Sequence, residues 1–140
     1  MPYVVETSVG LDRMFLSVLS AAYQNEKLED GSERVVLRIP AVLAPYKAAV
    51  LPLVKKDGLP EKARELMKSL QFDYSIQYDE KDSIGKRYRR QDAIGTPFSI
   101  TIDHQTLTDD TVTVRDRDTM EQIRVSMKEL EGLLAEKASW

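Results

Sequence analysis

Residues 48–54 form an almost unbroken apolar run, Ala-Ala-Val-Leu-Pro-Leu-Val, which limits the possible folds of the chain more than any other segment. A strand with one face in water alternates apolar and polar residues, whereas a continuous apolar run is typical of a strand buried on both faces, as in a parallel sheet. Pro52 lacks an amide hydrogen, so the regular part of the strand should end there. The run therefore predicts an α/β domain.

The segments after this strand alternate between helix and strand patterns. Pro60 can occupy the first turn of a helix whose apolar stripe ends at Leu70, and the next helix should stop at Gly95. Ser126 and Glu129 form a capping box for a last helix. Strands are expected at 74–78, 98–102, 112–115 and 123–125, with the polar loop 103–110 joining two of them in a hairpin. The order predicts a three-layer α/β domain with a mixed sheet of about five strands flanked by helices.

An N-terminal helix should precede this domain. Ser8 could cap it, and residues 9–25 place an apolar stripe at helical spacing: Leu11, Met14, Phe15, Val18, Leu19 and Ala22. The stripe needs a partner surface, either the following domain or a second copy of the chain. Residues 26–33 should form a loop, and residues 35–39 a short strand or an extended linker. We place a domain boundary near residue 40, which divides the chain into residues 1–39 and 40–140.

Composition excludes several kinds of site. The 140 residues suffice for one ordinary domain with a short extra segment. The absence of cysteine excludes disulfides, thiolate nucleophiles and cysteine zinc sites, and it suits a reducing cytoplasm. His104 is the only histidine, so a two-histidine metal site cannot form, and we expect no metal. No apolar run approaches the roughly 20 residues of a membrane helix, so we expect no membrane partner.

A basic cluster runs against the overall charge of the chain. The formal net charge is -3, yet four of the five residues 86–90 are cationic: Lys86, Arg87, Arg89 and Arg90. On a helix, Ile84, Tyr88 and Gln91 would share one packed face, and the cations would fan across the rest of the surface. Such a surface suits a polyanion, most plausibly the phosphates of a nucleic acid. The alternative is a solvated helix face paired with acids such as Asp79, Glu80 and Asp82.

A second charged segment, Arg115-Asp116-Arg117-Asp118, has two interpretations. Alternating charges at a strand end can form an ion-paired turn that satisfies itself. They can also present Arg115 and Arg117 to RNA, with the aspartates holding the guanidinium groups in place. The sequence leaves both interpretations open.

Several blocks, in order, resemble the C-terminal part of glycyl-tRNA synthetases. The first is residues 6–13, Glu-Thr-Ser-Val-Gly-Leu-Asp-Arg; the second is residues 43–53; the third and fourth are 83–98 and 115–122. Together they cover nearly the whole chain, which makes the resemblance far more specific than one short motif. It implies an anticodon-binding domain over residues 40–140. It also implies that residues 1–39 are a remnant of the class II catalytic domain.

The resemblance assigns roles to individual residues. In residues 6–13, which are similar to motif 3 of class II synthetases, Arg13 would contact ATP phosphates, and Glu6 and Ser8 would hold the amino group of glycine. Thr7 stands where relatives often have proline. The anticodon-binding domain would use Lys86, Arg87, Arg89, Arg90, Arg115 and Arg117 to contact tRNA. The full enzyme of this family uses ATP and Mg²⁺ and is typically a homodimer.

We therefore expect a piece of a glycyl-tRNA synthetase that binds the anticodon arm of glycine tRNA. Because motifs 1 and 2 are missing, we expect this chain alone to need no cofactor and not to aminoacylate. The rest of the catalytic domain would be its protein partner. One alternative is a non-catalytic accessory or protein-interaction module of the same fold. Another is a small-molecule-binding α/β domain, which the absence of a glycine-rich phosphate loop disfavours.

Overall fold

The computed structural model describes residues 2–138 and contains a mixed sheet of five strands. Their order across the sheet is β4 (Ile76–Tyr78), β3 (Ala48–Pro52), β5 (Phe98–Ile102), β6 (Thr111–Asp116) and β7 (Gln122–Ser126). Strand β3 is parallel to both β4 and β5, whereas β6 is antiparallel to β5 and β7. The predicted α/β class and the hairpin joining β5 to β6 are confirmed.

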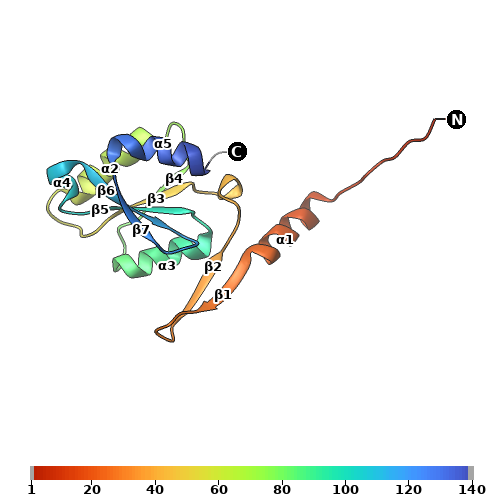
Figure 1. Ribbon diagram of the computed structural model, residues 1–140, viewed down its shortest axis with the longest axis horizontal. Helices are drawn as coiled ribbons and strands as arrows, with labels where there is room; N and C mark the ends of the chain where they lie inside the picture. The colour runs from red at the N-terminus through yellow and green to blue at the C-terminus, as the bar shows by residue number, and fades with distance from the viewer. Residues whose placement is uncertain (1, 139–140) are drawn as a thin grey trace.

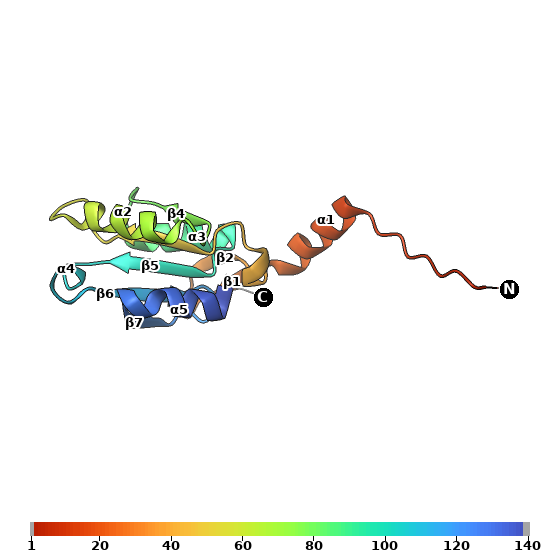
Figure 2. The ribbon, with the colours of Figure 1, turned by 90° about the horizontal axis from the view of Figure 1, so that it is seen from above.

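Helices cover both faces of the sheet (Figure 1). Helix α2 (Leu59–Leu70) lies over β3 and β4, and α5 (Met127–Ala138) lies beside it on the same face, over the β6–β7 side (Figure 2). Helix α3 (Ile84–Ile94) covers the opposite face. The apolar core lies between the sheet and the pair α2 and α5. Side chains of β3 are buried on both faces, as the apolar run predicts.

Local sequence signals fix several ends of these elements. Pro60 lies in the first turn of α2. The capping box is confirmed, because Ser126 Oγ donates to Glu129 Oε2 at 2.8 Å while the Glu129 amide donates to Ser126 Oγ at 3.3 Å. Helix α3 ends at Gly95, whose φ of 91° favours glycine. The predicted loop between β5 and β6 contains one short helical turn, α4 (Thr106–Asp109).

The N-terminal part differs from the prediction. Helix α1 (Leu11–Ala22) has Gly10 at its N-cap position and no side-chain cap, so the predicted cap by Ser8 is wrong. The helix ends at Ala22 because the next residues form β1 (Tyr23–Lys27), which pairs antiparallel with β2 (Glu33–Leu37). The polar residues of β1 carry no alternating pattern that would have indicated a strand. A short 3₁₀ turn, η1 (Ala41–Leu43), leads from the β1–β2 hairpin to β3.

Only the C-terminal end of the apolar stripe of α1 packs on the segment that follows, where Ala22 is buried against Ile39 and Ala44. Leu11 is 80% exposed, and Met14, Phe15 and Leu16 are exposed as well. Residues 2–10 extend away from the molecule before the helix begins (Figure 1). The expectation that the following domain covers this stripe is therefore wrong for the part of the stripe from Leu11 to Val18. None of the described helices is long and apolar enough to cross a membrane.

Candidate nucleic-acid interface

Helix α3 turns a polar side toward the sheet. Its buried residues are Arg87, Gln91 and Asp92, whereas Ile84 and Tyr88 are only half-buried. The face of the sheet beneath the helix carries polar side chains, including Thr101, whose hydroxyl lies 2.6 Å from the Tyr88 hydroxyl. The prediction that all four cations fan across the surface is thus wrong for Arg87.

Arg87 lies beneath the surface, at the carboxyl ends of two parallel strands. The residue is 3% exposed. Its guanidinium group donates to the backbone carbonyl of Pro52, which ends β3, and to that of Leu53 at 3.3 Å. A longer contact of 3.5 Å reaches the carbonyl of Asp79, just after β4. Arg87 therefore joins α3 to the ends of β3 and β4, and its contact with RNA is untested.

Arg90 pairs with acids, as the alternative interpretation of the basic cluster predicted. Its Nε donates to Asp79 Oδ2 at 2.9 Å, its Nη1 to Asp82 Oδ2 at 3.3 Å and its Nη2 to the Lys81 carbonyl at 2.9 Å. The hydrogen bonds to Asp79 and then to Asp82 raise the pKa of Arg90 above its usual value. The side chain holds the loop between β4 and α3 against the helix.

Lys86 and Arg89 are the cations of α3 that remain available to a ligand. Lys86 is exposed and forms no hydrogen bond or ion pair with any residue in the range 2–138. Arg89 is half-buried, and its Nη1 is shielded from water without a hydrogen-bond partner among the described residues. A buried donor without a partner is unfavourable, so an incoming acceptor oxygen would satisfy it.

Arg115 is held beneath α3 by a carboxylate. Its two terminal nitrogens donate to the two oxygens of Asp92 at 2.8 and 3.1 Å, and its guanidinium carbon lies 4.9 Å from the centre of the Tyr88 ring. Both Arg115 and Asp92 are buried. This paired, stacked arrangement is strong in a shielded environment. It gives Arg115 a structural partner, and contact with RNA stays a prediction.

Arg117 forms the ion-paired turn that was one of the two interpretations of residues 115–118. Its Nη1 donates to the Gly95 carbonyl at 2.9 Å, and its Nε and Nη2 donate to Asp118 at 2.9 and 2.8 Å. Burial raises the pKa of Asp118, but hydrogen bonds from Arg117 and nearby guanidinium charges outweigh burial and lower it overall. Arg117 is itself buried, and RNA contact by this residue is also untested.

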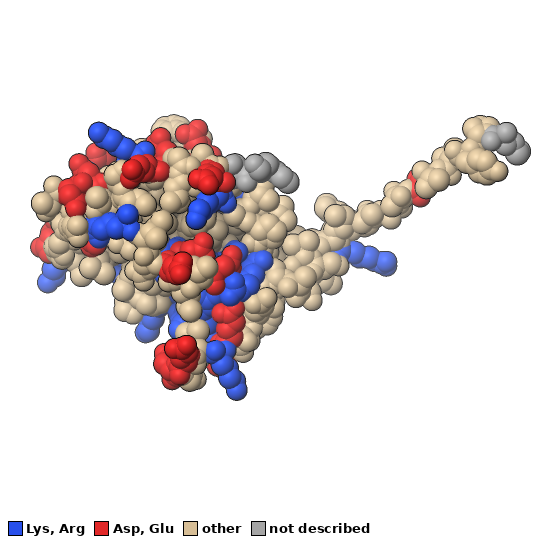
Figure 3. Space-filling view, viewed as in Figure 1, with Lys and Arg blue, Asp and Glu red and all other residues tan. Residues whose placement is uncertain are grey.

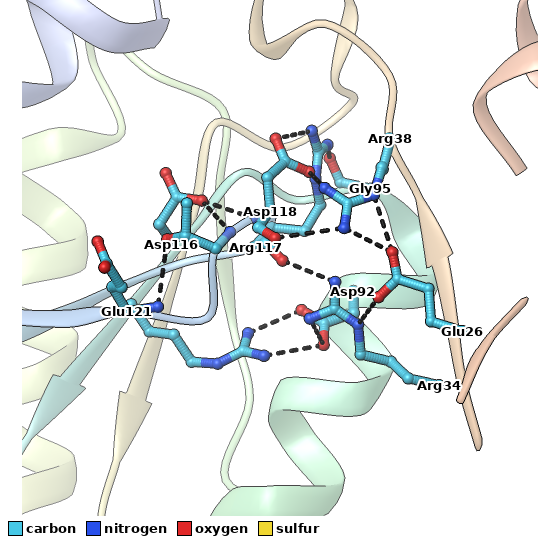
Figure 4. A network of polar contacts seen from close by, with 11 residues as sticks. Glu26, Arg34, Arg38, Asp92, Gly95, Asp116, Arg117, Asp118 and Glu121 are labelled. Carbon is cyan, nitrogen blue, oxygen red and sulfur yellow. Dashed lines mark hydrogen bonds and ion pairs between the residues drawn. The ribbon is translucent and has the colours of Figure 1, made fainter. Parts of the chain in front are cut away.

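Arg34 is a member of this polar network that the sequence did not indicate (Figure 4). It is fully buried on β2, with its Nη1 3.5 Å from Asp92 Oδ2, its Nη2 donating to the Arg117 carbonyl at 3.0 Å and its Nε donating to Glu26 at 3.1 Å. The period of two along β2 places Arg34 on the same face as the buried Val36, and this signal could have found it. The network fastens the β1–β2 hairpin to α3, while the boundary near residue 40 remains a prediction.

Two further cations lie at the same edge of the sheet as Lys86. Lys55 and Lys56 stand in the exposed loop that leaves β3, between Leu53 and Gly58. From β3 the chain reaches β4 on one side through α2, and from β4 it reaches β5 on the other side through α3. Ligands of α/β sheets bind outside the carboxyl ends of strands at such a reversal. The sequence-based prediction did not include these two lysines, although two adjacent cations directly after a buried strand were a usable signal.

The face drawn in Figure 3 mixes both signs of charge, and α1 carries few charges.

The residues assigned to glycine and ATP lie on the exposed arm and the first turn of α1: Glu6, Ser8 and Arg13. They do not converge on an enclosed site within residues 2–138, so they do not fit ATP or glycine by themselves. The described residues also contain no group of three His, Cys, Asp or Glu side chains able to hold a metal ion.

Comparison with known families decides what kind of domain this is. Residues 47–137 match the family described as "Anticodon binding domain". The chain belongs to the anticodon-binding domain family. The match covers the whole five-stranded sheet with α2, α3 and all but the last residue of α5. This membership confirms the family resemblance inferred for the larger part of the sequence.

The chain has close relatives among curated proteins. It is 55% identical over 136 residues to a glycine–tRNA ligase of Chlorobaculum tepidum, covering 97% of this chain and 29% of the relative. It is 50% identical over 140 residues to that of Clostridium tetani, covering 100% and 30%. The chain thus spans less than a third of the length of these relatives.

The fold also matches a solved structure. The RNA binding domain of threonyl-tRNA synthetase from Cryptosporidium parvum Iowa II superposes with a TM-score of 0.65 at 22% identity, covering 71% of this chain and 25% of that one. At this identity the likeness concerns the fold alone. It confirms the three-layer arrangement of the anticodon-binding domain.

Proposed function

We propose that this domain binds the anticodon arm of glycine tRNA as part of a glycine–tRNA ligase. The observation that carries the proposal is the match of residues 47–137 to the anticodon-binding family, together with 50–55% identity to glycine–tRNA ligases. Anticodon loops are single-stranded, and proteins bind such loops through phosphates, stacking and base edges.

The position of the available cations supports this proposal. Lys86 on α3 and Lys55 and Lys56 on the neighbouring loop are exposed at the carboxyl edge of the parallel strands. In a chain of net charge -3, an RNA contact has to rely on such a local group, because the whole molecule repels polyanions. Arg89 adds a donor that lacks a partner within the described part of the chain.

The proposal extends to a longer protein of the kind that the curated relatives represent. Attachment of glycine to tRNA, with ATP and Mg²⁺, would take place in the catalytic domain of that longer protein, in a cytoplasmic homodimer. Arg13, Glu6 and Ser8 would join that site only when the remaining residues surround them. We expect no aminoacylation by this chain alone, and product formation by it would overturn this point.

A protein contact through α1 is a second candidate function. The helix exposes Leu11, Phe15 and Leu16, an apolar surface of a kind that soluble proteins normally cover. We propose that the remaining part of the longer protein packs there. The alternative is that a second copy of the chain packs there, and sedimentation of the isolated chain tests it. A second copy would produce a dimer whose fraction rises with concentration, and substitution of Leu11 and Phe15 by glutamate would abolish that dimer.

Titration of the chain with transcribed glycine tRNA, and with a variant whose anticodon is exchanged, tests RNA binding. We expect binding that weakens as salt rises and drops for the exchanged anticodon. Lys86→Met should reduce the slope of log K against log salt by about 0.7–0.9, the value of one phosphate contact. The matched control is Lys68→Met on the far side, in α2, which should leave the slope unchanged. Equal binding to both RNAs would leave only generic phosphate attraction.

A further inference from the structure

The loop that leaves β3 is tied to the protein at few points. The Leu53 amide donates to the Ile102 carbonyl at 2.8 Å, and Asp57 Oδ2 lies 2.9 Å from His104 Nε2 in an exposed pair. Between these points the side chains of residues 53–56 are exposed, so packing contributes little to the shape of the loop. Within the described chain, neither Lys55 nor Lys56 has an ion-pair partner. The loop therefore depends on its backbone contacts.

Arg87 supplies the contacts that join this loop to α3. Its guanidinium group binds the carbonyls of Pro52 and Leu53, where the loop begins, and reaches the carbonyl of Asp79. Arginine presents several donors in a planar fork, so one side chain can bind carbonyls from two strands at once. A single ammonium group of lysine lacks this geometry. Because Arg87 is 3% exposed, its charge is not offered to a ligand in solution.

We infer that Arg87 is a positioning residue for RNA: it fixes the loop of residues 53–58 so that Lys55 and Lys56 face the polyanion on the same edge as Lys86. The inference rests on the proposed RNA-binding function and adds a division of labour within the basic cluster. Lys86 lies in the same turn of α3 as Arg87. The contact between Arg87 and the loop therefore also sets the position of the loop relative to Lys86. Arg87 thus acts through the two lysines.

Salt dependence separates a positioning role from a direct contact. Loss of one phosphate contact lowers the slope of log K against log salt by about 0.7–0.9, and loss of two lowers it by about 1.4–1.8. We expect the double variant Lys55→Gln/Lys56→Gln to lower the slope by the larger amount. Arg87→Met should lower it almost as much, although it removes one charge. In the triple variant, Arg87→Met should add nothing further, since coupled residues are not additive.

The conservative variant gives an independent decision. Arg87→Lys keeps the charge but loses the fork, so we expect it to bind tRNA as weakly as Arg87→Met does. Full recovery of affinity in Arg87→Lys, or a slope change near 0.8 that adds to the double lysine variant, would make Arg87 a phosphate contact and overturn the inference. Unchanged tRNA affinity in Arg87→Met would overturn it as well. Lys68→Met, which removes one exposed cation from α2, is the control.

Amide hydrogen exchange without RNA keeps the two proposals distinguishable. The Leu53 amide, bonded to Ile102, and the Leu59 amide, bonded to Lys56 at 3.2 Å, report on the two ends of the loop. In Arg87→Met we expect both to exchange at least about ten-fold faster, while the amides of β5 keep their rates. Unchanged exchange would refute the ordering of the loop even if tRNA binds. If the unaltered chain binds no tRNA, the proposed function fails together with the role in RNA binding, whereas faster exchange would still establish that Arg87 orders the loop.

Discussion

Substitution of Asp92 by an isosteric neutral residue should lower the free energy of unfolding strongly, although it changes the shape of the side chain little. Its carboxylate is buried and accepts two hydrogen bonds from Arg115, at 2.8 and 3.1 Å, while a nitrogen of Arg34 lies 3.5 Å away. Asp92→Asn keeps the volume but leaves the buried guanidinium group of Arg115 without a counter-charge and that of Arg34 with Glu26 alone. Breaking a buried ion pair by removing one partner costs about 3–5 kcal/mol. We expect a loss of that size in the free energy of unfolding.

Urea unfolding followed by circular dichroism measures this loss. With a denaturant slope of about 2 kcal/mol per molar, a loss of about 4 kcal/mol shifts the unfolding midpoint by about 2 M. The control is Asp118→Asn, at a carboxylate whose side chain is 44% exposed and that also contacts two arginines, where we expect about 1 kcal/mol or less. A midpoint for Asp92→Asn equal to that of Asp118→Asn would refute the argument that buried charge governs this face of the sheet.

Three further predictions concern other parts of the chain. Hydrogen bonds from Arg124 hold the pKa of Asp103 well below its ordinary value, so the stability that Asp103 adds should be complete above about pH 4 and fall as the pH drops further; urea midpoints of Asp103→Asn and the unaltered chain should therefore converge only in acid. Gly95→Ala should cost about 1–3 kcal/mol in thermal unfolding, because φ is 91° and the added Cβ meets two atoms at 3.0 Å; Gly58→Ala, with φ of 79° and open space, should cost less. Leu11→Glu should change the free energy of unfolding by less than about 0.5 kcal/mol, since Leu11 is 80% exposed, and a larger loss would mean that α1 packs on the domain.

The fold was predictable where a single segment carried the decisive signal. The apolar run at β3 fixed its burial on both faces, and the capping box and Pro60 located the starts of two helices. Strand β1 could not be predicted in this way, because Tyr-Gln-Asn-Glu-Lys has no apolar alternation. It exists through its pairing with β2, a contact between residues that the pattern of β1 does not encode.

The roles of the charged residues on α3 were predictable only in part. At about 100° per residue, the four cations of α3 fan over adjoining parts of the helix surface, and their spacing does not separate those that bind within the protein from those that remain available. The sequence therefore predicted four cations at the surface, whereas in the structure Arg87 is buried and Arg90 pairs with Asp79 and Asp82. Which cation turns inward depends on acceptors elsewhere in the chain: the carbonyl bound by Arg87 belongs to Pro52, 35 residues earlier.

This division explains how a basic helix can both fold and bind. Four cations that all faced solvent would repel one another and leave the polar side of the sheet uncovered, whereas four inward cations would leave no group for a phosphate. Arg87 and Arg90 bind carbonyls and carboxylates at the ends of β3 and β4, and guanidinium groups suit those acceptors. Lys86 keeps a mobile, hydrated charge at the surface. The double variant Lys86→Arg/Arg87→Lys exchanges the two side chains and keeps every charge in the cluster. If this variant loses both the slow amide exchange of the loop and its affinity for tRNA, the loss has to arise from side-chain geometry alone.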